Sequence, residues 1–198
     1  MSVVMALKYN GGVLLAADTQ STGGNIKNNN AVKIKKMKYS NVAIGTVGYL
    51  RDANIFEVTD EIVDFKDILD KIKIDKRYII NTIVPNIFKK MKEYNRLEIK
   101  NEVENLLSCF ILVTPTGIFT IGTDGSVVES ENFATVGCGD ELVRGYLETI
   151  SDINNLNEKE GINIIKNAII KSCKNDIYIN DMISILNIKN GGQNEEKI

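Results

Sequence analysis

The chain has 198 residues, 43% of them hydrophobic, so it is long enough to bury one sizeable core. A formal net charge of −2, with 25% charged residues, excludes the strong charge excess of proteins that bind nucleic acids or membrane surfaces. We expect a single domain over residues 1–190, followed by a disordered tail over residues 191–198.

The chain contains no histidine, which excludes a Ser-His-Asp triad, a Cys-His pair and a His-ligated zinc site. A hydrolase of this composition needs a lysine, a carboxylate or the α-amino group as its general base. The α-amino group has an unperturbed pKa of about 7.7–8.0, which suits proton transfer at neutral pH. The three cysteines have no paired spacing, which favours a reducing cytoplasm over a disulfide framework.

A β-hairpin is predicted at the start of the chain. The Asn-Gly-Gly sequence at 10–12 separates two apolar runs, and Asn-Gly in that setting is a strong hairpin signal. The run before the turn has no basic leader and is too short to cross a membrane. Folding back at the turn places Ser2 within about two residue positions of Asp18. If Met1 is removed, Ser2 becomes the chain terminus, so we expect the hairpin to present Ser2 as an N-terminal nucleophile.

A second hairpin is predicted after a polar stretch, residues 19–30, which we expect to be a loop. Its strands are residues 32–37 and 42–48, joined by a turn at 39–41. Counting outward from that turn places Lys33 opposite Val47, one residue from Gly48. Each hairpin therefore carries its unusual residues to one end.

The remaining pattern alternates between helices and strands. A helix is predicted over 49–67, then a charged linker over 67–75 and a helix over 76–94, in which Pro85 predicts a kink or a shifted boundary. Strands follow at 108–114, 117–121, 126–129 and 133–136, then helices at 140–150 and 158–174 and a strand at 182–188. This order predicts an α+β fold, a four-layer αββα sandwich of two packed antiparallel sheets with helices on both outer faces.

The motifs resemble, in the same order, those of the β-type subunits of the proteasome family, including the HslV ring protease, within the N-terminal nucleophile (Ntn) hydrolases. The resemblance rests on residues 11–18 with Thr22 and Gly24, and on residues 32–34, 45–52, 136–139 and 176–179. The last segment is closer to HslV than to the proteasome proper. The resemblance spans almost the whole chain and implies the Ntn hydrolase fold and peptide-bond hydrolysis.

The resemblance also implies roles for individual residues. In that family a threonine exposed by processing is the nucleophile, and Ser2 occupies its place here. Asp18 matches the family aspartate, and Gly48 matches the glycine whose N–H forms the oxyanion hole. Lys33 matches the active-site lysine when a one-residue deletion is placed in the preceding polar stretch; without that gap Ile34 would fall there.

Further along the chain the family pattern is partly altered. A supporting serine of the family is replaced by Cys138, and Asp176 matches a further family aspartate. A serine often lies three residues beyond that aspartate, whereas this chain has Ile179, as HslV does. The likeness to HslV also implies a monovalent cation such as Na+, held by backbone carbonyls at the positions of Asn175, Tyr178 and Asp181.

Each candidate also has a structural interpretation. A serine after methionine is common, and Lys33 lies among several other lysines. A carboxylate that ends an apolar run, as Asp18 does, nevertheless needs a cationic partner, and Lys33 is the candidate. Gly48 could mark only a strand-to-helix junction, and Asp176 only a helix end. Without a histidine to activate it, Cys138 is not expected to act as an independent catalytic thiol.

The combined expectation is a cytoplasmic ring homo-oligomer in which Ser2 attacks unfolded polypeptides with its own α-amine as base, without a required cofactor. The chain lacks the Gly-x-x-x-x-Gly-Lys-Ser/Thr motif, so a separate ATP-dependent unfoldase would deliver the substrates. Two alternatives remain open. One is a non-catalytic ring subunit like the α-type subunits, which retention of Met1 would favour, and the other is an Ntn enzyme that acts on a small amide.

Overall fold

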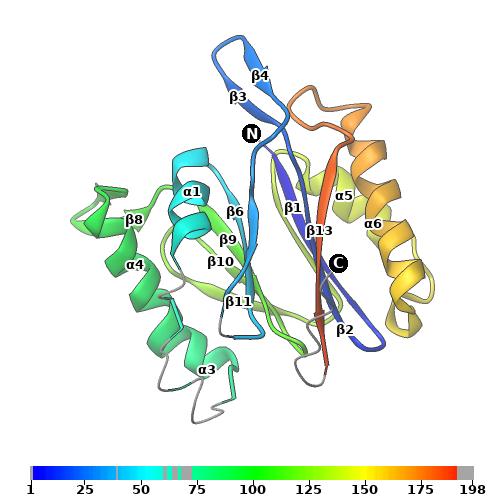
Figure 1. The fold of residues 1–198 in the computed structure, drawn as a ribbon, viewed down its shortest axis with the longest axis horizontal. Helices are drawn as coiled ribbons and strands as arrows, with labels where there is room; N and C mark the ends of the chain where they lie inside the picture. Colours follow the sequence, from blue (N-terminus) through cyan, green and yellow to red (C-terminus); the bar gives the residue numbers. More distant parts are fainter. Residues whose placement is uncertain (1, 39, 60–61, 64–66, 68–72, 191–198) are drawn as a thin grey trace.

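The computed structural model describes residues 2–38, 40–59, 62–63, 67 and 73–190 (Figure 1). Met1, the predicted tail over 191–198 and most of the predicted charged linker lie outside the described residues. The elements of the first half are β1 (Val3–Tyr9), β2 (Gly12–Asp18), β3 (Ser21–Gly23), β4 (Ile26–Asn28), β5 (Ile34–Lys36), β6 (Ala43–Val47), α1 (Leu50–Val58), α3 (Lys76–Tyr78), the π-helical turn η1 (Ile79–Ile83) and α4 (Val84–Glu93). The elements of the second half are β7 (Leu97–Lys100), β8 (Val103–Leu106), β9 (Cys109–Val113), β10 (Ile118–Ile121), β11 (Val127–Ser130), β12 (Phe133–Gly137), α5 (Asp140–Glu148), the 3-10 turn η2 (Ile153–Asn155), α6 (Glu158–Cys173) and β13 (Ile183–Lys189).

The described strands form two main antiparallel sheets and two short ribbons. The four-stranded sheet has the order β12-β1-β2-β13, and the five-stranded sheet has the order β11-β10-β9-β6-β5. The ribbons are β3–β4 and β7–β8. No helix among the described residues is long and apolar enough to span a membrane.

Successive side chains of β1 enter two different cores, because neighbouring residues of a strand point to opposite faces of the sheet. Val3, Met5 and Leu7 belong to a core shared with α5 and α6. Val4 and Ala6 belong to a second core, which lies between the two main sheets and includes residues of β2, β6 and β9. This double burial explains why β1 is apolar at nearly every position.

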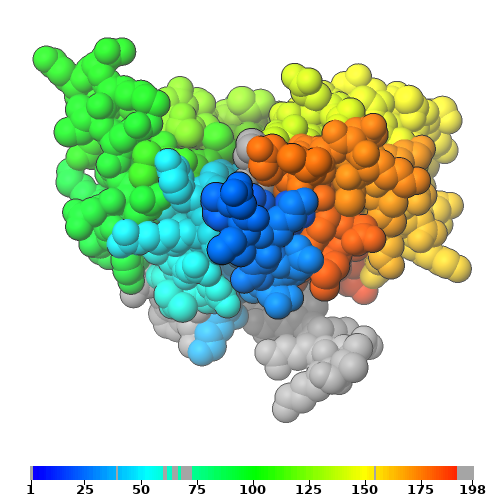
Figure 2. All heavy atoms as spheres, turned by 90° about the horizontal axis from the view of Figure 1, so that it is seen from above, coloured from blue at the N-terminus to red at the C-terminus, as the bar shows by residue number. Residues whose placement is uncertain are grey.

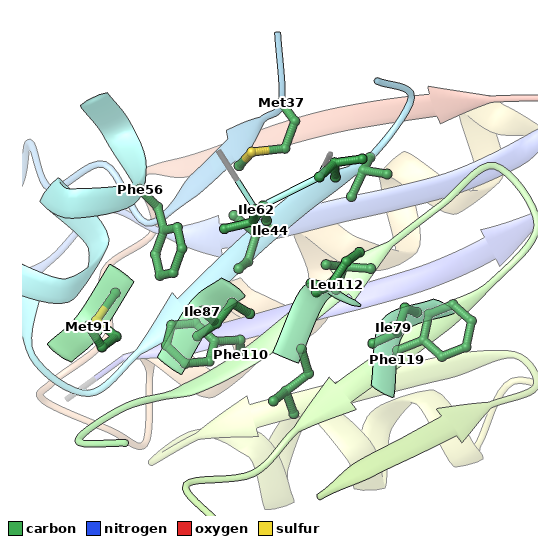
Figure 3. Packing of buried hydrophobic residues seen from close by; sticks show 14 of the residues in the cluster. Met37, Ile44, Phe56, Ile62, Ile79, Ile87, Met91, Phe110, Leu112 and Phe119 are labelled. Atoms are coloured by element: carbon green, nitrogen blue, oxygen red, sulfur yellow. The ribbon is translucent and has the colours of Figure 1, made fainter. Parts of the chain in front are cut away.

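A third core fills the space between the five-stranded sheet and α1, η1 and α4 (Figure 3). The rings of Phe56 from α1 and Phe110 from β9 meet edge to face, with centroids 5.3 Å apart. Both side chains are among the largest that are fully buried. Truncating such a phenylalanine to alanine typically costs about 3–5 kcal/mol, so these contacts fix α1 firmly on the sheet.

The first hairpin forms as predicted. Tyr9 pairs with Gly12 at the end of the ladder, and Val4 pairs with Ala17 at the other end. Gly11, in the turn, has a φ of +125°, a conformation that glycine adopts without strain. Continuing the register past Val4 leaves Ser2 and Asp18 about one position apart across the pair, within the predicted separation.

The second hairpin forms with a register that differs by one residue from the prediction. Ile34 pairs with Gly45, and the N–H of Thr46 donates to the carbonyl of Lys33 at 2.9 Å. Lys33 therefore lies opposite Thr46, not Val47. The stretch 19–30 is also not simply a loop, because β3 and β4 form a short ribbon within it. Its many Gly and Asn residues predicted a loop instead of this pairing.

The two predicted helices of the first half have different outcomes. The first is shorter than expected: α1 ends at Val58, and Thr59 is extended. Ile62 and Val63 nevertheless enter the core, from a non-helical turn, which is why the apolar pattern of this stretch predicted a longer helix. In the second helix the prediction at Pro85 is confirmed, because the regular helix restarts at Val84 after a π-helical turn. Proline lacks the N–H that an uninterrupted α-helix would use there.

The elements predicted for the second half agree with the structure to within a few residues at each end. The β7–β8 ribbon was not predicted. Its turn uses Asn101 and Glu102, both in the left-handed region with φ of +49° and +64°, and glutamate is an unusual residue for that conformation. The open ends of β1, β2 and β6, with the β3–β4 ribbon, gather at one edge of the molecule (Figure 1).

Candidate active site

Asp18 is bonded to the residue that follows Ser2. The N–H of Val3 donates to Asp18 Oδ1 at 2.9 Å, a contact that the register of the β1–β2 hairpin dictates. Ser2 itself is buried, and its Oγ approaches the carbonyl of Gln20 at 3.5 Å. The predicted approach of Ser2 and Asp18 is therefore present in the structure.

Lys33 forms a buried ion pair with the same carboxylate. Its Nζ lies 2.9 Å from Asp18 Oδ1, while the N–H of Gln20 donates to Oδ2 at 3.0 Å. The Asp18 side chain is fully buried and that of Lys33 nearly so. A buried charge needs this kind of pairing and hydrogen bonding, so the predicted partnership of these residues is present.

Burial lowers the pKa of Lys33 from its ordinary value of 10.5. The charge of Asp18 and its hydrogen bond act in the opposite direction but do not outweigh the loss of hydration. Lys33 is therefore easier to deprotonate than a lysine in water.

A surface pocket opens beside these residues. It is lined by Ser2, Ser21, Thr22, Lys33, Thr46, Gly48, Tyr49, Leu50 and Ala53. These side chains come from the start of β1, the β3–β4 ribbon, the ends of β5 and β6, and the first turn of α1. Ser2, Lys33 and Gly48, three of the predicted site residues, thus face one concavity.

Gly48 has a backbone conformation that favours glycine. Its φ is +137°, and a Cβ at this position would lie 2.4 Å from Ser108 Oγ. The neighbouring N–H of Tyr49 donates to that same Oγ at 3.0 Å. Gly48 is therefore both a tight strand-to-helix junction and a pocket residue.

Cys138 lies beside Ser2, and Asp176 lies beside Cys138. The thiol of Cys138 donates to the carbonyl of Ser2 at 3.4 Å. Cys138 is exposed, but loss of hydration at its thiol, and then the nearby carboxylate of Asp176, raise its pKa to about 11. The thiol is protonated at neutral pH, which agrees with the prediction that it is not an independent nucleophile.

The segment between α6 and β13 contains the residues predicted for a cation. Asn175 Nδ2 donates to the carbonyl of Lys171, and the N–H of Tyr178 donates to Asp176 Oδ1 at 2.8 Å. The described residues hold no cluster of three His, Cys, Asp or Glu side chains that would bind a metal. A cation here would depend on backbone carbonyls, as those of Asn175, Tyr178 and Asp181 were predicted to provide.

This segment is fastened to the start of the β3–β4 ribbon, which Figure 2 shows between α1 and the segment after α6. The carbonyl of Ile177 accepts from Gln20 Nε2 and from Lys27 Nζ, each at 2.9 Å. The N–H of Thr19 donates to Asn180 Oδ1 at 3.0 Å. Gln20 was not predicted as a site residue, although it follows Asp18 by only two positions.

A second buried network, beneath the pocket, was also missed. Asp52 is fully buried and accepts hydrogen bonds from Ser108 and Arg96. Asp52 belongs to one of the motif segments quoted above, but its partners are 56 and 44 residues away in the sequence. Nothing in the sequence around Ser108 or Arg96 indicated this contact.

Comparison with known proteins gives a consistent result. The profile of the family described as Proteasome subunit matches residues 2–188. An ATP-dependent protease subunit HslV from Campylobacter fetus subsp. fetus (strain 82-40) is 25% identical over 186 residues, which are 92% of this chain and 93% of that protein. The crystal structure of eukaryotic HslV from Trypanosoma brucei superposes with a TM-score of 0.65 at 17% identity, covering 95% of this chain and 99% of that one. The last likeness concerns the fold alone.

Proposed function

The chain belongs to the proteasome subunit family, and from this premise we propose that it is an HslV-like peptidase subunit whose nucleophile is Ser2. The observation that carries the proposal is the sharing of Asp18 Oδ1, which accepts from Lys33 Nζ and from the N–H of Val3, each at 2.9 Å. This arrangement ties a buried cation to the backbone beside Ser2. The αββα layer order of Ntn hydrolases belongs to the same proposal, supported by one core between the two sheets and two cores between a sheet and helices.

The proposed reaction begins after Met1 is removed. The free α-amine of Ser2 takes the proton from Oγ, directly or through a water, and Oγ attacks a peptide carbonyl. The carbon–nitrogen bond then breaks, the leaving amine takes that proton, and the acyl group remains on Oγ as an ester. Water hydrolyses the ester and restores the hydroxyl. With no histidine in the chain, the α-amine is the group whose ordinary pKa best suits this exchange.

Gly48 and Lys33 stabilise the charges that develop. The N–H of Gly48 donates to the oxyanion, where one such donor is worth about 3–4 kcal/mol. Lys33 lines the same pocket as Ser2, and its ammonium, held by Asp18, favours the deprotonated hydroxyl and lowers the pKa of the α-amine. The lowered pKa of Lys33 reflects the loss of hydration that its ammonium suffers when it is buried.

Cys138 and Asp176 support the nucleophile in this proposal. Cys138 donates to the carbonyl of Ser2, and the carboxylate of Asp176 lies beside the thiol. The hydrogen bond from Cys138 therefore helps to fix the main chain of Ser2. A thiol is a weaker donor than the serine that it replaces in the family pattern, so its contribution is small.

The proposal includes a monovalent cation such as Na+ at the segment between α6 and β13. Hard cations prefer oxygen ligands, and the carbonyls of Asn175, Tyr178 and Asp181 would hold it. The neighbouring carbonyl of Ile177 already accepts from the ammonium of Lys27, so this turn directs a carbonyl at a positive charge. The cation would order the segment that carries Asp176.

The proposed assembly is a cytoplasmic ring homo-oligomer that receives unfolded polypeptides from a separate ATP-dependent unfoldase. The related Campylobacter protein is named as a subunit of an ATP-dependent protease, while this chain lacks the phosphate-binding motif.

Ser2→Ala tests the nucleophile. The variant is expected to assemble like the wild type, because a single hydroxyl at the strand end is lost, but to hydrolyse no unfolded polypeptide. Size-exclusion chromatography follows the assembly, and release of peptides from casein follows hydrolysis. Hydrolysis by Ser2→Ala at the wild-type rate would sink the proposal. A wild type that assembles but hydrolyses neither polypeptides nor small amides would instead indicate the non-catalytic ring subunit.

A further inference from the structure

A buried polar network contacts the pocket residues Gly48 and Tyr49. Asp52, in α1, is fully buried, and its Oδ2 accepts from Ser108 Oγ at 2.6 Å. Its Oδ1 accepts from Nε of Arg96, which lies between α4 and β7. Three segments that are distant in sequence therefore meet at one carboxylate.

Ser108 contacts Gly48 and holds the backbone that follows it. The β6–β9 ladder ends with Val47 opposite Cys109, so the next residues, Gly48 and Ser108, face each other. Ser108 Oγ accepts the N–H of Tyr49, and the Ser108 side chain occupies the space that a Cβ of Gly48 would need. Because the Ser108 hydroxyl donates its hydrogen to Asp52, the lone pairs of Oγ remain available to accept from Tyr49.

Arg96 extends the same network to the rim of the pocket. Its guanidinium carbon lies 4.7 Å from the ring centroid of Tyr49, a pocket residue that is 58% exposed. Its Nη2 is buried without a hydrogen-bond partner among the described residues. A planar guanidinium that pairs with a carboxylate and stacks on an aromatic ring makes contacts that lysine cannot reproduce.

Stability alone gives a poor account of this arrangement. A buried ion pair is often no more stabilising than apolar residues of the same volume, because both charges lose their hydration. This pair also leaves the buried Nη2 amino group of Arg96 without a hydrogen-bond partner among the described residues, which adds a further cost. What the network does supply is a fixed orientation for the segment from Gly48 to Tyr49.

We propose that Asp52, Ser108 and Arg96 are positioning residues that aim the Gly48 N–H at the oxyanion of the reaction; this inference rests on the proposed peptidase function. None of the three touches the substrate, and Ser108 acts through the backbone of residues 48 and 49. Losing an oxyanion donor lowers kcat by about 10²–10³-fold, and a misplacement of about 1 Å can cost 10²-fold.

Ser108→Ala is the direct test. It removes the acceptor for Tyr49 and the donor to Asp52 while leaving the small side chain beside Gly48. We expect kcat for a fluorogenic peptide to fall about 10- to 100-fold while KM stays within about twofold, because the lost interaction belongs to the transition state. The affinity for a peptide boronate, whose tetrahedral adduct resembles that state, should fall by the same factor as kcat/KM.

Thr114→Ala is the matched control. Thr114 is a buried residue next to the other end of β9, and its Oγ1 accepts the N–H of a second glycine, Gly117, at 2.9 Å. The control removes a comparable hydroxyl far from the pocket, so kcat should be unchanged. Arg96→Lys keeps the positive charge but loses the stacking and the fork, so a smaller loss of kcat is expected.

Hydrogen exchange gives a readout that does not depend on activity. In Ser108→Ala, the amide hydrogens of residues 48–50 should exchange faster, whereas those of the core strand β1 should not. Unchanged kcat and unchanged exchange in Ser108→Ala, or an equal loss of kcat in Thr114→Ala, would overturn the positioning role alone. A wild type that hydrolyses no peptide would overturn the proposed peptidase function and this role with it.

Discussion

Lys33 Nζ lies 2.9 Å from Asp18 Oδ1, and their side chains are only 5% and 0% exposed. The same oxygen accepts the N–H of Val3, so the ion pair is bonded directly to the residue that follows Ser2. A change in the charge of either partner should therefore change the electrostatic environment at the start of β1. Several of the following predictions depend on this relationship.

Asp18→Asn should abolish most hydrolysis and destabilise the protein. The amide keeps an acceptor for Val3 but removes the negative charge that compensates Lys33. Removing one partner of a buried ion pair typically costs about 3–5 kcal/mol. Urea denaturation gives the free energy of unfolding, and peptide hydrolysis gives the activity.

The matched control for Asp18→Asn is Glu104→Gln. Glu104 pairs with Lys92 at the surface, where the two side chains are 44% and 67% exposed. An exposed pair of this kind contributes about 0–1 kcal/mol, so stability and activity should be nearly unchanged. Equal effects of the two variants would contradict the importance assigned to the buried pair.

As the pH rises, kcat/KM for hydrolysis should begin to fall before pH 10.5 is reached. Burial lowers the pKa of Lys33 from that value, so the ammonium is lost earlier than in an exposed lysine. On the acidic side, activity should rise as the α-amine of Ser2 deprotonates. A profile of kcat/KM against pH checks both limbs, and a rate that stays constant beyond pH 10.5 would contradict the role of Lys33.

The contribution of Lys33 to the free energy of unfolding should rise with pH on the alkaline side, where the rate of hydrolysis falls. Its pKa is lower in the folded chain than in the unfolded chain, so just below pH 10.5 the unfolded state binds more protons. The contribution of this group to the free energy of unfolding therefore rises with pH in that window. Comparison of wild type with Lys33→Met by urea denaturation at several pH values isolates this contribution, which should be absent in the variant.

Cys138 should resist alkylation in the folded protein. A pKa raised from 9.0 to about 11 reduces the thiolate population at neutral pH about a hundredfold. Iodoacetamide at pH 7.5 should therefore modify Cys138 slowly, at a rate that rises sharply after unfolding, as mass spectrometry of digested protein can measure. Fast labelling of the native protein would contradict the environment described for this thiol.

Cys138→Ser should retain hydrolysis, because the hydroxyl can donate the same hydrogen bond to the carbonyl of Ser2.

Gly48→Ala should be both destabilised and inactive. The new Cβ would lie 2.4 Å from Ser108 Oγ, and a φ of +137° is unfavourable for alanine. Strain of this kind costs about 1–3 kcal/mol before any steric clash is counted. Thermal unfolding and peptide hydrolysis measure the two effects.

Gly145→Ala, in α5, is the control for that substitution. A Cβ at Gly145 would meet nothing within 4 Å, and alanine favours a helix over glycine by about 1 kcal/mol. This variant should therefore be slightly stabilised and fully active. Loss of activity in Gly145→Ala would show that glycine replacement as such impairs the enzyme.

The sequence predicted those parts of the site that local patterns determine. An Asn-Gly turn and two-residue alternation brought Ser2 beside Asp18, and the likeness to a family selected Lys33 and Gly48. The register of the second hairpin differs by one residue from the prediction, because composition does not define the geometry of its turn.

The network around Asp52 was beyond local reasoning for a different reason. Ser108 and Arg96 reach Asp52 only because α1 packs on β9 and the segment after α4 returns to the same point. Such long-range contacts leave no periodicity in the sequence. The β3–β4 ribbon was missed because Gly and Asn residues usually indicate a loop.

The intact mass of the purified protein, before and after treatment with a peptide epoxyketone or a β-lactone, tests the central claim most directly. The claim that Ser2 is an N-terminal nucleophile predicts a chain that lacks Met1 and gains one adduct of the reagent, with no adduct in Ser2→Ala. A chain that retains Met1 and gains no adduct would contradict it.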